Sequence, residues 1–207
     1  MTTPPKTPRP VSHNNPCPFL RALVAQGQLA DDTAPLHQVA QVIASTARKG
    51  EGQPKVPSAL VYGIALGANG IGPLSLLQNQ RGGLRLNQLR NGPLDKKGVG
   101  SGLLDRQGKV SLPAFERLRG FAQTKTASDG STELGLGLPE LVKFMDANFA
   151  RASGTRRRID RALMNGEWPI LLKVMGKNGP DGRYLSLAEV KALFVKRQLP
   201  QRMRAPV

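Results

Sequence analysis

Prolines stand at the start of most segments in which apolar residues recur at helical spacing. Pro18, Pro35 and Pro57 each lead into such a segment. A proline fits the first turn of a helix, where its missing N–H would have no acceptor, but it breaks a helix interior. We therefore expect helices to begin at these three prolines, and the first of them to end at Gly27.

The second half of the chain repeats this pattern. Five further helix starts are predicted: after Ser111, from Leu138–Pro139, after an N-cap at Thr155, at Pro169 and from Ser186, where Ser186 and Glu189 form a capping box. Residues 79–108 and 127–137 are rich in glycine and are predicted to be irregular connections. No strand pattern of useful length appears, so the predicted fold class is all-α, a mainly helical single domain.

The length of the chain, 207 residues, suits one domain with a substantial core. We expect a flexible arm over residues 1–15, a helical domain over 16–200 and a short tail over 201–207. Six Phe, two Tyr and one Trp are few for this length. The core must therefore rest on aliphatic side chains or be completed by a group that is not protein. The helix from Leu138 is expected to bury one face, made of Leu138, Leu141, Val142, Met145 and Phe149.

Two features predict the compartment. One cysteine excludes an internal disulfide. The stretch Met1–Pro10 is polar and rich in Pro and Thr, unlike a signal peptide, and the longest apolar runs, such as Ala59–Leu66, are too short to span a bilayer. The sequence therefore predicts a soluble, cytoplasmic protein with no membrane span.

The chain carries 30 Lys and Arg against 14 Asp and Glu, a formal net charge of +16. Such a surplus is compatible with a nucleic acid, an anionic membrane or an anionic cofactor as partner. The basic residues lie in several clusters, and aromatic residues do not alternate with them as a single-strand stacking surface requires. We therefore expect no nucleic-acid partner, and keep a basic nucleic-acid-binding protein as an alternative.

Two segments, Gly108–Leu112 and Gly182–Leu187, resemble the second half of an EF-hand calcium loop. With Gly108 aligned on the loop glycine, Leu103 and Ala114 occupy positions where calcium needs oxygen ligands. Both segments are explained as capped helix starts.

Cys17 lies between Pro16 and Pro18, just before the first predicted helix. A single cysteine in a helical protein is usually a small buried hydrophobe. Here, however, the two prolines fix the backbone, and the unpaired N–H groups of the helix start favour a thiolate. The thiolate is the form that ligates iron.

The segment Asn15–Leu23, continued by Gln26-Gly27-Gln28-Leu29, is similar to the Pro-Cys-Pro segment of haem-thiolate peroxidases, the chloroperoxidases and unspecific peroxygenases of fungi. Three further blocks follow in the family's order: Ser101–Phe115, Gly166–Met175 and Val190–Pro200. The resemblance implies that Cys17 is the proximal ligand of a haem b iron. It implies a helical domain around a haem pocket, and an enzyme that uses hydrogen peroxide to oxidise or oxygenate a small organic substrate.

The chain departs from the family where a Glu-His-Asp segment is expected. It has Leu103-Leu104-Asp105 there. The family's glutamate helps to bind a structural magnesium near a haem propionate, so this resemblance does not predict that ion, and Asp105 alone is not a site. A short bacterial or intracellular relative is the description we adopt.

Glu167 is the second candidate catalytic residue. By resemblance it is the distal acid–base that moves a proton between the two oxygens of the peroxide. The alternative is an acid favoured by the dipole of a helix starting at Pro169. Trp168 beside it could line a substrate pocket, but a place in the core is the simpler interpretation.

Two histidines are rival haem ligands. His13 lies in the predicted arm, and His37 lies at a helix start without a Cys-x-x-Cys-His attachment motif. The remaining alternative is a haem-free helical protein that acts through interactions alone.

Overall fold

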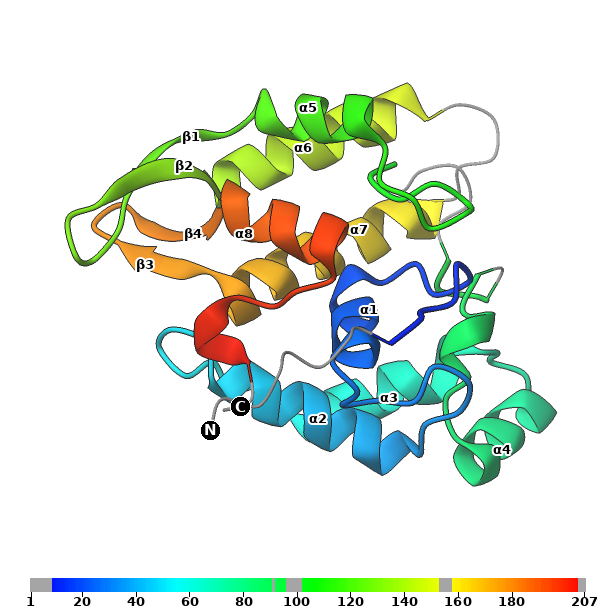
Figure 1. Cartoon of the computed structure of the whole chain (residues 1–207). Coiled ribbons are helices and arrows are strands. Elements are labelled where there is room, and N and C mark those ends of the chain that lie inside the picture. Colours follow the sequence, from blue (N-terminus) through cyan, green and yellow to red (C-terminus); the bar gives the residue numbers. More distant parts are fainter. Residues whose placement is uncertain (1–8, 91, 96–101, 153–157, 205–207) are drawn as a thin grey trace.

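The computed structural model describes residues 9–90, 92–95, 102–152 and 158–204. Four helices occupy the lower part of Figure 1: α1 (Pro18–Ala25), α2 (Leu36–Arg48), α3 (Ser58–Ala68) and α4 (Pro73–Gly82). A short 3-10 turn, η1 (Leu86–Gln88), follows them. Above them lie a sheet and the later helices α5 (Leu112–Arg119), α6 (Leu138–Arg151), α7 (Arg158–Met175) and α8 (Leu187–Lys191). The fold is mainly helical, with a small antiparallel sheet.

That sheet corrects the all-α prediction. Its strands are β1 (Gln123–Thr126), β2 (Thr132–Gly137), β3 (Lys177–Gly179) and β4 (Gly182–Ser186), in the antiparallel order β1-β2-β4-β3. Two hairpins, β1–β2 and β3–β4, join through β2 and β4. Most of the segment 127–137, expected to be a loop, is therefore a hairpin turn followed by β2. Gly135 is needed in β2 because a Cβ there would lie 2.4 Å from Cδ2 of Tyr184 on β4.

Most predicted helix starts are confirmed. Helices begin at Pro18, after Pro35 and after Pro57, and Gly27 takes a positive φ of 73° just after α1. Ser111 and Ser186 cap α5 and α8 by accepting backbone N–H groups three residues on, and α6 begins at Leu138. The start predicted after Thr155 lies outside the described residues.

Two helical predictions are wrong. Pro169 does not begin a helix, because α7 runs through it from Arg158 to Met175. Helix α4 was not predicted, and its last four residues fall in the stretch 79–108 that was predicted to be irregular. Its start at Pro73 after Gly72 follows the same rule as the other helices.

The core is aliphatic, with one aromatic row. Phe121, Phe144, Trp168 and Phe194 follow one another with ring centroids 5.8, 5.5 and 6.3 Å apart. This row joins α6, α7 and η2 (Ala192–Lys196), a π-helical turn that continues α8, before the closing 3-10 turn η3 (Gln201–Met203). Trp168 is 5% exposed and belongs to the core.

The predicted face of α6 is only partly right. Leu141 and Met145 are fully buried, but Leu138 and Val142 are 50% and 38% exposed. Phe144 takes their place in the core.

Candidate functional site

Cys17 is the N-cap residue of α1. Its backbone is extended, with φ −82° and ψ 113°, and its carbonyl accepts the Arg21 N–H at 2.9 Å. Pro18 fills the first turn, so the N–H groups of Phe19 and Leu20 have no acceptor within the helix. The half-buried sulfur is thus held at the positive end of a helix, a place that favours a thiolate.

Asn15 fixes the approach to this cysteine. Its side-chain Oδ1 accepts the Cys17 N–H at 3.2 Å, and the residue is fully buried. Its Nδ2 is buried with no hydrogen-bond partner among the described residues. Buried amide groups are nearly always paired, because leaving one unpaired costs about 1–3 kcal/mol. An unpaired donor two residues from Cys17 is the kind of atom that a bound group would satisfy.

Arg21 lies beneath the Pro-Cys-Pro segment and is 3% exposed. Its Nη1 donates to the carbonyls of Ser12 at 2.8 Å and Asn15 at 3.0 Å, and its Nη2 donates to the Gly108 carbonyl at 3.2 Å. Burial and the charge of Arg197 lower the pKa of Arg21, while Asp31 and Cys17 act in the opposite direction. Arg21 therefore fixes the segment and supplies positive charge to the cysteine.

Arg90 fastens the same segment to the loop that contains Asp105. Its backbone N–H donates to the Asn14 carbonyl at 2.9 Å, and its Nη2 donates to the Asp105 carbonyl, also at 2.9 Å. The Asp105 carboxylate accepts the Lys109 N–H at 2.8 Å, so it closes its own loop. Among the residues described, no group of three or more acidic, His or Cys side chains could hold a metal ion.

Glu167 lies in the interior of α7 and is exposed, beside the buried Trp168. The interpretation of Glu167 as a helix-start acid is wrong, because α7 begins nine residues earlier. Cys17 makes hydrogen bonds to Asn15 and Arg21. Glu167 lies on a different element, α7.

Two other acidic side chains, Glu133 and Glu140, make hydrogen bonds to residues of the sheet. Glu133 accepts hydrogen bonds from Lys177 at 2.5 Å, Ser186 at 2.5 Å and Tyr184 at 3.0 Å. Burial raises its pKa, but these hydrogen bonds outweigh burial and hold the pKa of Glu133 below its ordinary value. Glu140 accepts the Gly137 N–H at 2.8 Å and pairs with Lys125 at 3.1 Å.

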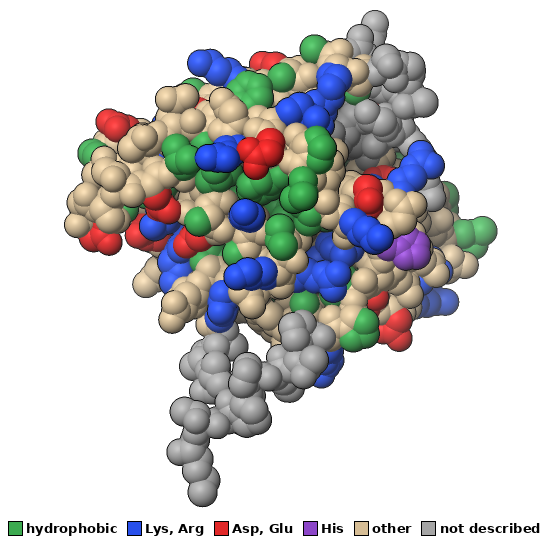
Figure 2. Space-filling view, turned by 45° about the horizontal axis from the view of Figure 1, so that its top comes forward, with side chains coloured by type: hydrophobic (Ala, Val, Ile, Leu, Met, Phe, Trp, Pro, Cys, Tyr) green, Lys and Arg blue, Asp and Glu red, His purple; other side chains and the backbone are tan. Residues whose placement is uncertain are grey.

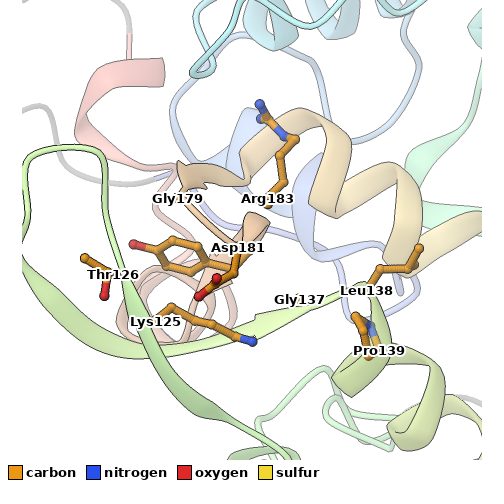
Figure 3. A pocket seen from close by; sticks show the side chains of 10 residues that line it. Lys125, Thr126, Gly137, Leu138, Pro139, Gly179, Asp181 and Arg183 are labelled. Carbon is orange, nitrogen blue, oxygen red and sulfur yellow. The ribbon is translucent and has the colours of Figure 1, made fainter.

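A cavity of about 240 Å³ opens between the two hairpins and the start of α6, lined in part by Lys125, Asp181 and Tyr184 (Figure 3). A second cavity of about 440 Å³ lies beside α4, lined by Leu77, Arg81 and Arg85 among others. Neither cavity is lined by Cys17 or Glu167. The rival ligands His13 and His37 are both exposed.

Basic side chains are plentiful on the face of the molecule that Figure 2 shows. Figure 2 shows Lys and Arg side chains in single positions and small groups across one face, with fewer Asp and Glu.

No family model matches this chain, and neither the curated proteins nor the solved structures contain a significant match. The assignment of this candidate site therefore depends on the geometry of its residues alone.

Sequence reasoning missed three residues of the site. The hydrogen bonds of the site are made by Asn15, Arg21 and Arg90. Two of these residues could have been recognised from the sequence. Asn15 stands two residues before Cys17, the spacing at which an Asn side chain accepts a backbone N–H. Arg21 is a charged residue inside an otherwise apolar helix.

Proposed function

We propose that this chain binds one haem b through the Cys17 thiolate and acts as a peroxidase or peroxygenase that uses hydrogen peroxide on a small organic substrate. The observation that carries the proposal is the setting of Cys17. The sulfur lies at the start of α1, between two prolines and within electrostatic reach of the buried guanidinium of Arg21. A merely structural cysteine needs none of these features.

Several groups around Cys17 support the proposal. The N–H groups of Phe19 and Leu20 can donate to the ligating sulfur, which tunes a thiolate-bound iron. The unpaired Asn15 Nδ2 offers a further donor. Arg90 and Arg197 lie within electrostatic reach of Arg21, so positive charge is available for the two haem propionates. When bound, the haem supplies the iron centre at which peroxide is reduced and the substrate is oxidised.

The protein's own part in the reaction is ligation and proton transfer. Cys17 supplies the electron-rich sulfur ligand, and Arg21 holds it in register. Glu167 would act as the acid–base that moves a proton between the two oxygens of the peroxide.

Haem titration tests the ligand assignment. The parent protein should bind one haem per chain, and Cys17→Ala should lose most of the haem, because no other cysteine can replace it. Cys17→His should keep haem yet lose oxygen transfer, since imidazole donates less electron density than thiolate. The control His37→Ala should bind haem like the parent. Equal haem retention in Cys17→Ala would mean that another residue ligates the haem, and a parent that binds no haem would leave a haem-free interaction protein as the better description.

A further inference from the structure

A stretch of 25 residues, Val56 to Gln80, contains no charged side chain, although 21% of the whole chain is charged. It forms α3, the turn after it and most of α4, the helix that projects at the lower right of Figure 1. No single helix in the described part of the chain is long and apolar enough to cross a membrane. Helices α3 and α4 are long and apolar enough only when taken together, and the chain bends by 119° between them.

The outer side of this helix pair is apolar and exposed. Leu60 and Ile64 lie one turn apart on α3, and Ile71 continues their stripe in the turn, where its Cγ2 approaches Gly67. Leu74 and Leu77 follow on α4. The exposed fractions of these five side chains are 51, 47, 68, 75 and 43%. We call these five residues the hairpin patch.

Hydrogen bonds hold the backbone that carries the patch in a fixed conformation. Asn79 is fully buried, and its Nδ2 donates to the Leu66 carbonyl at 2.8 Å, which ties α4 to α3. Asn69, at the end of α3, exchanges two hydrogen bonds of 2.8 and 2.9 Å with the backbone of Arg85. The turn that carries Ile71 is thus held in place from both sides.

Basic residues border the patch. Lys55 and Arg81 flank the uncharged stretch on either side. Arg81 and Arg85 line the cavity of about 440 Å³ together with Leu77, which belongs to the patch. Within the described ranges, no ion pair engages the guanidinium of Arg81 or Arg85.

We propose that the α3–α4 hairpin docks on a bilayer surface that contains anionic phospholipid. The hairpin patch enters the acyl boundary, and Arg81 and Arg85 contact headgroup phosphates. This combination of an apolar face and bordering cations is what interfacial membrane binding requires. A second copy of the chain fits less well, because it would bring the same arginines and the same net charge of +16 against this face. The proposal is independent of haem binding.

Vesicle co-sedimentation tests it with the full chain. Vesicles of phosphatidylcholine mixed with phosphatidylglycerol should bind the protein, and vesicles of phosphatidylcholine alone should bind it far less. Leu74→Glu should weaken binding by about tenfold or more, since it removes an inserted side chain. Arg81→Gln should weaken it by about fivefold. The matched control is Leu112→Glu on α5, which should bind like the parent, since Leu112 is similarly exposed, 68% against 75% for Leu74.

Three results would overturn the proposal. The parent could fail to sediment with the mixed vesicles, or Leu74→Glu could bind as well as Leu112→Glu. Alternatively, sedimentation velocity without lipid could reveal a dimer that Leu74→Glu dissociates, and the patch would then belong to a second copy. Far-UV circular dichroism of each variant separates these outcomes from misfolding.

Discussion

Arg21 couples the stability of the fold to the chemistry of the cysteine, so Arg21→Met should change both. The substitution keeps much of the apolar stem but removes donors to the carbonyls of Ser12, Asn15 and Gly108. Hydrogen bonds from a charged donor contribute about 1.5–3 kcal/mol each. The third bond, at 3.2 Å, is the longest of the three, and the cost of burying the guanidinium, which lowers its pKa, offsets part of the gain. We therefore expect a net loss of about 2–4 kcal/mol in the free energy of unfolding.

Urea denaturation followed by circular dichroism measures this loss. The control Arg119→Met removes an arginine whose side chain is 58% exposed, and it should change the free energy of unfolding by less than about 0.5 kcal/mol. A second assay follows the alkylation of Cys17 by iodoacetamide as a function of pH. The attraction between the Arg21 guanidinium and the Cys17 sulfur favours the reactive thiolate. Arg21→Met should therefore move the midpoint of the alkylation profile to higher pH.

The reasoning would be refuted if Arg21→Met unfolded at the same urea concentration as Arg119→Met and kept the parent's alkylation profile. Arg21→Lys should fall between the parent and Arg21→Met, because an ammonium keeps the charge but cannot donate to three carbonyls in a fork.

Four other predictions address the sheet, the core, the proton relay and the charge. Glu133→Gln should lower stability by about 1–3 kcal/mol at neutral pH. Because the folded pKa of Glu133 is depressed, its contribution is full above its ordinary value of 4.5 and is lost as pH falls below it, so the parent and Glu133→Gln should converge in acid unfolding curves. Trp168→Ala should cost about 3–5 kcal/mol in a denaturant titration, since it removes the centre of the aromatic row. In stopped flow, Glu167→Gln should slow the peroxide step by about 10²–10⁴ while haem content stays unchanged, and a peracid should partly restore the rate. Finally, gel-shift assays should detect no tight duplex-DNA binding that falls by about 10³–10⁵ between about 50 and 200 mM salt.

The helices could be predicted because their starts are local. Pro18 and the capping serines Ser111 and Ser186 satisfy the first turn of their own helices, which needs no tertiary contact. Pro169 misled the prediction for the opposite reason. Packing of Trp168 against Phe144 and Phe194 holds a continuous α7 across a residue that would break an isolated helix.

The sheet could not be predicted from periodicity. Strand β1 reads Gln-Thr-Lys-Thr, and β3 has three residues that end in glycine. Such strands are stabilised by partners far along the chain, as when Glu133 on β2 accepts hydrogen bonds from Tyr184 and Ser186 on β4. The sequence holds no local sign of these pairings.

The candidate site was predictable only at its centre. Cys17 stands out by its neighbours, but the Gly108 loop reaches it through the Arg21 side chain across 87 positions of sequence. The role of Asn15 could have been read from its spacing, whereas that of Arg90 depends entirely on the fold.

The optical spectrum of the ferrous, carbon monoxide-bound protein tests the central claim most directly. A thiolate ligand shifts the Soret band to the red in a way that a histidine ligand does not. The account predicts this shifted band in the haem-loaded parent and its loss in Cys17→Ala. A histidine-type Soret band in the parent, or a parent that retains no haem at all, would contradict the assignment of Cys17 as a haem ligand.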